Sequence, residues 1–194
     1  MIEQDKILWC PVALPKFPKE EFLSCVDHLV KQQEKWKDIW HAANISREHL
    51  SAIRQENNVI DEWFNTLPSK SILKIKLNVQ INPVVEHVDI DPVRWNEENP
   101  KLLNHWLRNE PAGYRVLISG TRKNKLYITV DNKKIYTEIP SDTDTYLMNS
   151  SVYHGVDDDV DRKLLYMNLE IDDVKHKKLV ETSYNKYKKF VVEK

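Results

Sequence analysis

The stretch that decides the fold is Ile72-Leu73-Lys74-Ile75-Lys76-Leu77-Asn78-Val79-Gln80-Ile81, where the spacing of apolar side chains changes to two. Side chains two apart on an extended chain point to the same face, so Ile75, Leu77 and Val79 share one face. This alternation predicts a half-buried strand. It also divides the chain into a helical part before residue 70 and a β-rich part after it.

Five later segments have a similar extended pattern. They span 114–118, 125–130, 134–139, 145–148 and 163–169. Asp131 and Asn132 are turn-forming residues between the second and third segments, and they predict a hairpin there. We therefore expect a mainly β chain of the α+β class, folded as an antiparallel sandwich or jelly roll with N-terminal supporting helices.

The N-terminal segment 1–69 has helical spacing of apolar side chains. Pro18 precedes acidic residues and predicts a helix start. Ser46 is a candidate N-cap for a second helix that ends before Pro68. The stretch 92–111, which contains Trp95 and Trp106, predicts a short helix and loop near the site described below. The lysine-rich segment 173–194 also carries apolar residues that are compatible with a helix packed on the core, and its basic side chains are expected to form a solvated face rather than a nucleic-acid surface.

Composition excludes several classes of protein. The chain has 194 residues and a formal net charge of −1, so no global charge attracts nucleic acid or anionic lipid. Its three glycines form no phosphate-binding loop, and no apolar run reaches the roughly 20 residues of a membrane span. With Cys10 and Cys25 as its two cysteines and no secretory signal at the N-terminus, the chain is expected to be cytoplasmic, in a microbe or in a virus-infected host.

Three side chains have the composition and order of a metal site. His87 and Asp89 are two residues apart, so an extended backbone directs both side chains to one side. His154, which lies far downstream of Asp89 in the chain, supplies a third donor. Two imidazoles and one carboxylate are the facial triad of non-haem Fe(II) oxygenases, which leaves coordination positions open. Asp91 is a rival to Asp89 in this set.

Arg162 opens a strongly apolar strand shortly after His154. The guanidinium group has a rigid fork of donors that matches a carboxylate. An arginine in this position predicts a binding site for an acid beside the metal.

The order His87-x-Asp89, His154, Arg162 resembles the Fe(II)/2-oxoglutarate-dependent oxygenase superfamily, and the text around these residues is most similar to the aspartyl/asparaginyl β-hydroxylase-like and prolyl-hydroxylase-like branch. The resemblance covers residues 70–172. It implies a double-stranded β-helix core, also called a cupin-like jelly roll, within a single oxygenase domain of residues 1–194. The implied cofactors are Fe(II), held by His87, Asp89 and His154, and the cosubstrate 2-oxoglutarate, held by Arg162.

The same resemblance implies further contacts and an activity. Arg115 stands where this branch often has a second basic residue facing the cosubstrate, and Tyr127 and Asn78 are alternative cosubstrate or substrate contacts. The implied enzyme is a dioxygenase that uses dioxygen to hydroxylate an amino-acid residue of a protein or peptide, or a free amino acid. The aspartyl β-hydroxylases often lack the carboxylate ligand that Asp89 supplies, so their substrate is not transferred.

Other functions stay open at this point. A cupin-type metal enzyme without a keto acid would need the triad but not Arg162. A non-catalytic β-sandwich binding module would need neither. A nucleobase oxygenase is disfavoured, because no basic groove with interleaved aromatic residues precedes the tail.

Overall fold

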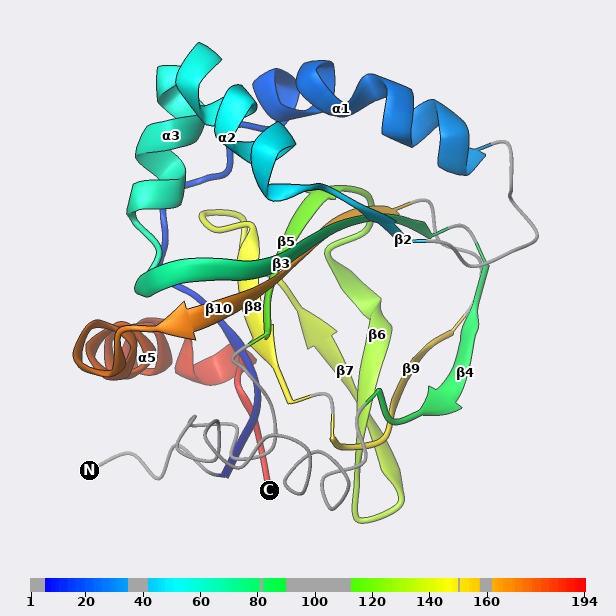
Figure 1. The fold of residues 1–194 in the computed structure, drawn as a ribbon. Helices are drawn as coiled ribbons and strands as arrows, with labels where there is room; N and C mark the ends of the chain where they lie inside the picture. The colour runs from blue at the N-terminus through cyan, green and yellow to red at the C-terminus, as the bar shows by residue number, and fades with distance from the viewer. Residues whose placement is uncertain (1–5, 35–41, 81, 90–112, 150, 158–161) are drawn as a thin grey trace, which may run out of the picture.

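The computed structural model describes residues 6–34, 42–80, 82–89, 113–149, 151–157 and 162–194. Figure 1 shows helices on one side of a long curved sheet and a smaller sheet on the other side. The expected helix and loop of 92–111, with Trp95 and Trp106, lies outside the described residues, as does Asp91.

Two sheets form the body of the protein, and all their strand pairs are antiparallel. The larger sheet has the order β11 (Val192–Glu193), β1 (Ile7–Pro11), β8 (Thr145–Met148), β5 (Gly113–Ser119), β10 (Arg162–Ile171), β3 (Ser69–Gln80) and β2 (Ala42–Asn44). The smaller sheet has the order β4 (Val84–His87), β9 (His154–Val156), β6 (Lys123–Val130) and β7 (Lys133–Glu138). The prediction of a mainly antiparallel β fold is confirmed, and the arrangement is compatible with a β-sandwich.

The core has two parts, one on each face of the larger sheet. Between the sheets, Leu117 and Leu164 of the larger sheet pack with Ile128 and Val156 of the smaller one. On the opposite face, Ile75 and other buried side chains pack against the N-terminal helices. Residues of β3 therefore alternate between the helical layer and the space between the sheets, where the polar side chains Asn78 and Gln80 are buried.

Three helices cover the outer face: α1 (Lys19–Glu34), α2 (Arg47–Glu56) and α3 (Asn58–Asn65). The predicted cap is present, because the Ser46 side chain accepts a hydrogen bond from the backbone N–H of His49 at 3.1 Å. The prediction of one helix from Ser46 to Pro68 was wrong. Asn57 interrupts it with an extended backbone (φ −136°, ψ 102°), and its side chain accepts a hydrogen bond from Ile60 N–H and so caps α3.

All six predicted strands are present, and the hairpin between β6 and β7 turns on Asp131 and Asn132, whose φ angles are 49° and 60°. Five strands were not predicted. β1 is buried at every position, so it lacks the alternation that marks a half-buried strand. The other four, β2, β4, β9 and β11, have two to four residues and are too short to show a period.

The two terminal segments are part of the core rather than additions to it. The N-terminal segment 1–69 contributes β1 and β2 to the larger sheet as well as the helices. The segment 173–194 contains the helix that its apolar residues allowed, because α5 (Asp173–Tyr187) buries Val180 and Tyr187, and β11 pairs with β1. Among the described residues, no helix is long and apolar enough to cross a membrane.

Candidate metal centre

The pairing of β4 with β9 brings the two predicted histidine ligands together. His87 and His154 are direct partners in the strand register, and their ring centroids lie 4.5 Å apart. Asp89 follows two residues after His87, and one donor atom from each of the three residues lies within 4.8 Å of the other two. The three donors therefore converge on one point, as a mononuclear metal site requires.

Both imidazoles are oriented by hydrogen bonds to the backbone. His87 Nδ1 lies 2.8 Å from the Val85 carbonyl oxygen, and His154 Nδ1 lies 2.9 Å from that of Val152. A carbonyl oxygen only accepts, so each Nδ1 donates its proton to the backbone, and each ring directs Nε2 toward Asp89. Metal-binding histidines in proteins are held in this manner by a second partner.

Asp89 lies between the two rings. Its Oδ1 is 3.1 Å from His87 Nε2, and its Oδ2 is 3.6 Å from His154 Nε2. Burial opposes ionisation of the carboxyl group, but the hydrogen bond from His154 and the charges of Arg115, His154 and His87 outweigh burial and hold the pKa of Asp89 well below its usual value. The carboxylate is thus ionised and available to a cation.

Arg115 takes part in the site through Asp89. Its Nη2 lies 3.3 Å from Asp89 Oδ2, its Nη1 donates to the Met148 carbonyl at 3.3 Å, and its guanidinium stacks 5.1 Å from the centroid of the Tyr166 ring. These contacts hold the Asp89 carboxylate from the side of the larger sheet. The resemblance implied that Arg115 faces the cosubstrate. The contact that the structure describes is with Asp89, the carboxylate donor of the site.

Arg162 lies in the same cavity as the three donors. It is 6% exposed, and its Nε donates to Gln80 Oε1 at 2.8 Å across the β10–β3 pair. Within the described part of the chain, Gln80 is its only hydrogen-bond partner, and no carboxylate forms an ion pair with it. Since burying a cation without a counter-ion is costly, the guanidinium is suited to receive an anionic ligand.

Three polar side chains of the cavity were not predicted from the sequence: those of Gln80, Tyr146 and Tyr166. Burial raises the pKa of Tyr146 to about 12, so its hydroxyl stays protonated and able to donate a hydrogen bond. Tyr146 is the register partner of Arg115 in the β5–β8 pair, and Tyr166 is the partner of Arg115 in the β10–β5 pair. The three side chains come together only through pairing between strands that are far apart in the chain, and the sequence pattern does not show this pairing.

Two predicted contacts do not line this cavity. Tyr127 pairs with Gly155 on β9, while the cavity residues of β9 and β6 include His154 and Leu126 on the other face of the sheet. The Lys134 ammonium lies 4.1 Å from the centroid of the Tyr127 ring. Asn78 is fully buried two residues before Gln80, and neither its amide nitrogen nor its amide oxygen has a hydrogen-bond partner in the described part of the chain.

No protein-family model matches this chain, and no curated protein matches its sequence. Its fold is similar to that of a Pseudomonas putida prolyl-4-hydroxylase, with a TM-score of 0.43 and 8% identity over 84% of this chain and 93% of that one. It is also similar to an oxidoreductase of the 2OG-Fe(II) oxygenase family from Burkholderia pseudomallei, with a TM-score of 0.37 and 9% identity over 75% of this chain and 81% of that one.

Both similarities are remote, and they assign no role to the site residues.

Proposed function

We propose that this protein is an Fe(II)- and 2-oxoglutarate-dependent dioxygenase that hydroxylates an amino-acid residue of a protein or peptide, or a free amino acid. One observation carries the proposal. Two Nε2 atoms and an ionised carboxylate converge within 4.8 Å, and the same cavity holds a buried arginine that has no carboxylate partner in the described part of the chain.

The proposal includes the finer fold assignment. The two antiparallel sheets would form a double-stranded β-helix, with residues 70–172 as its core in a single domain of residues 1–194. The segment 1–69 would support this core, and 173–194 would close it through α5 and β11. A cytoplasmic location, in a microbe or in an infected host, is part of the same proposal.

Each site residue has a role in this proposal. His87, Asp89 and His154 hold Fe(II) and leave three coordination positions open. Arg162, held by Gln80 through Nε, binds the distal carboxylate of 2-oxoglutarate with its two Nη atoms, and the Tyr146 hydroxyl donates to the same cosubstrate. Arg115 fixes the Asp89 carboxylate. When bound, Fe(II) and 2-oxoglutarate supply the activation of dioxygen, which is chemistry that no side chain performs.

The apolar lining has a separate task. Val84, Leu126, Met148 and Val156 line the cavity beside the polar groups. Apolar walls lower the local dielectric and strengthen the interaction of Arg162 with a bound carboxylate. They would also exclude bulk water from the bound metal and its cosubstrate.

The alternatives are disfavoured by specific observations. A cupin-type enzyme without a keto acid gives no reason for a buried arginine beside the metal donors that forms no ion pair with any carboxylate of the described residues. A non-catalytic binding module gives no reason for two imidazoles that both direct Nε2 at one carboxylate. Neither observation identifies the substrate.

Anaerobic titration of the metal-free protein with Fe(II) and then 2-oxoglutarate tests the proposal through the visible charge-transfer band of the iron–keto acid chelate. We expect a band in the wild-type protein, no band in His154→Ala, and a band that needs at least about tenfold more 2-oxoglutarate in Arg162→Ala. Arg54→Ala, which removes a surface arginine of α2, is the matched control and should titrate like the wild type.

Two results would overturn the proposal. If iron binds and no band forms, the cupin alternative replaces the keto-acid assignment. If the wild-type protein and His154→Ala bind iron equally weakly, the three donors are not a metal site and the binding-module alternative replaces it.

A further inference from the structure

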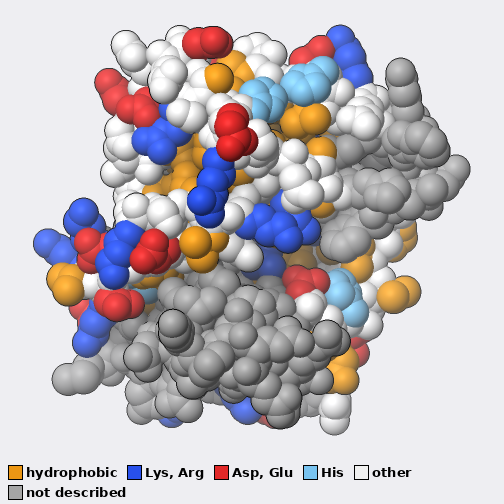
Figure 2. Space-filling model, viewed as in Figure 1, with side chains coloured by type: hydrophobic (Ala, Val, Ile, Leu, Met, Phe, Trp, Pro, Cys, Tyr) orange, Lys and Arg blue, Asp and Glu red, His pale blue; other side chains and the backbone are white. Residues whose placement is uncertain are grey.

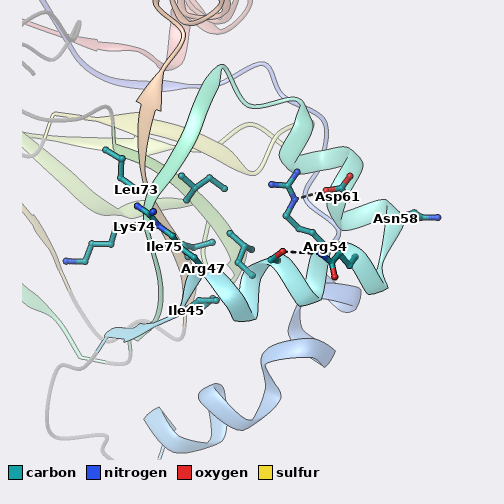
Figure 3. A pocket seen from close by; sticks show the side chains of 12 residues that line it. Ile45, Arg47, Arg54, Asn58, Asp61, Leu73, Lys74 and Ile75 are labelled. Atoms are coloured by element: carbon teal, nitrogen blue, oxygen red, sulfur yellow. Dashed lines mark hydrogen bonds and ion pairs between the residues drawn. The ribbon is translucent and has the colours of Figure 1, made fainter.

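β3 separates two faces of the molecule that differ in polarity. Its apolar side chains, such as Ile75 and Leu77, pack toward the helical layer. A groove of about 450 Å³ lies there between α2, α3 and β3, and Arg54 in its lining donates to Asp61 at 2.6 Å (Figure 3). No residue of this groove lines the cavity around the metal donors, so the groove is separate from the metal centre.

The opposite face of β3 is polar from residue 74 to residue 80. Successive residues of a strand point to opposite faces, and Gln80 lines the cavity of the metal centre. The face of Gln80 therefore also carries Lys74, Lys76 and Asn78. Asn78 is fully buried, Lys76 is half-buried and Lys74 is exposed, so this polar row runs from the cavity to the surface.

Lys76 lies beside the metal centre. It is the register partner of Tyr166, which is in turn the partner of Arg115, and Arg115 holds the Asp89 carboxylate. The charge of Asp89 acts on Lys76 and favours its protonated form. Figure 2 shows lysine or arginine side chains beside acidic and histidine side chains on this face of the molecule. An ammonium group thus stands at the edge of the cavity.

Lys76 and Arg162 lie at different ends of the polar row. Arg162 is the register partner of Gln80, which lies about 13 Å from Lys76 along β3. In the proposed function Arg162 holds the distal carboxylate of 2-oxoglutarate, so the cosubstrate takes the Gln80 end. The Lys76 end, beside Asp89, is left for the substrate.

The two lysines of this row carry positive charge that the described residues do not neutralise. Neither Lys74 nor Lys76 forms an ion pair with a described carboxylate. Burial, followed by the charge of Lys74, lowers the pKa of Lys76, and the charge of Asp89 opposes this effect without reversing it. The Asp89 oxygens are directed at the two imidazoles and at Arg115. An anionic group between the two ammonium groups would offset their repulsion.

We propose that the substrate carries a carboxylate that Lys76 and Lys74 bind at the mouth of the metal cavity. This inference rests on the proposed function, which places iron and 2-oxoglutarate in the same cavity. A carboxylate has acceptor positions for both ammonium groups. The carboxylate belongs either to the side chain of an acidic residue in a peptide or to the α-carboxyl group of a free amino acid.

Anaerobic isothermal titration calorimetry on the protein loaded with Fe(II) and saturating 2-oxoglutarate tests this proposal. Three probes of nearly equal size are compared. N-acetylglutamate α-amide carries a side-chain carboxylate, N-acetylglutamine carries an α-carboxylate, and N-acetylglutamine α-amide carries neither. We expect one of the two acids to bind at least about tenfold more tightly than the neutral amide, with an affinity that falls as salt is added. The acid that binds identifies the source of the carboxylate.

Protein variants then locate the binding site. In Lys74→Gln/Lys76→Gln, affinity for the preferred acid should fall about tenfold or more, and affinity for the neutral amide should stay the same. Lys70→Gln is the matched control, because it removes an exposed cation near the start of the same strand. All three lysines are at least partly exposed, so the variants are expected to fold.

Each protein is first titrated with Fe(II) and 2-oxoglutarate, which separates this inference from the proposed function. If the chelate band does not form in the wild-type protein, the proposed function fails and the inference falls with it. If the band forms, equal binding of the three probes, or no binding of either acid, overturns the inference alone. Equal losses of affinity in Lys70→Gln and in the double variant would show a diffuse charge effect in place of a site.

Discussion

His87 and His154 face one another across the β4–β9 pair, with their ring centroids 4.5 Å apart. The two strands have four and three residues, so this short pairing alone fixes the separation of the two imidazoles. Any change that separates β4 from β9 should therefore affect metal binding before it affects the rest of the fold.

Gly155→Ala tests this dependence. A Cβ atom at Gly155 would lie 2.8 Å from the Val84 carbonyl oxygen on β4, 2.7 Å from Cζ of Tyr127 and closer still to the Tyr127 hydroxyl. Since these neighbours are a backbone carbonyl and a buried ring, both β4 and Tyr127 must shift away from β9. We expect a loss of about 1–3 kcal/mol in the free energy of unfolding and at least tenfold weaker iron binding. Unchanged iron affinity would show that the pairing does not position the imidazoles.

Arg115→Gln tests how the carboxylate donor is held. Arg115 Nη2 lies 3.3 Å from Asp89 Oδ2, and glutamine is too short and uncharged to replace this contact. We expect iron affinity to fall about 10- to 100-fold, the usual effect of losing a partner of a metal ligand. Affinity for 2-oxoglutarate, measured with iron saturating, should change less than in Arg162→Ala. The reverse order would assign Arg115 to the cosubstrate.

Asp144→Ala tests an anchor outside the site. The Asp144 carboxylate is fully buried and contacts Lys19 Nζ at 2.8 Å, the Phe17 N–H at 3.2 Å and the Arg122 guanidinium. Its removal leaves two partly exposed cations and the Phe17 N–H without their acceptor, so we expect a loss of about 3 kcal/mol in urea unfolding. Asp142→Ala is the control, because that carboxylate is 51% exposed and should cost less than about 1 kcal/mol. Similar losses in both variants would refute the anchor.

Cys10 should make stability depend on pH in the alkaline range. Burial, with a smaller effect of the Glu193 charge, raises the pKa of the Cys10 thiol from 9.0 to about 12. Between these values the unfolded chain loses the proton and the folded chain keeps it, so stability falls as pH rises. From pH 9 to pH 10, the wild-type protein should lose about 1 kcal/mol more than Cys10→Ala, measured by urea unfolding under reducing conditions. Parallel losses in the two proteins would contradict this.

The sequence determined the features that depend on local order. The alternation around Ile75 and Leu77 predicted β3, Asp131 and Asn132 predicted the hairpin, and Ser46 predicted the start of α2. The spacing of His87 and Asp89 predicted that they act together, since residues two apart on an extended chain share a side. With His154 and Arg162 later in the chain, they form the motif order that resembles the Fe(II)/2-oxoglutarate-dependent oxygenases, and this resemblance predicted a metal site beside a binding site for an acid.

The tertiary structure decided which segments meet. The pairing of β4 with β9, the placement of Tyr146 beside Arg115, and the entry of β1 into the larger sheet join residues far apart in the chain. Periodicity records only which face of a strand is buried, and two- to four-residue strands carry too few side chains to record even that. Their partners are selected by packing between the sheets, which exists only once the chain has folded.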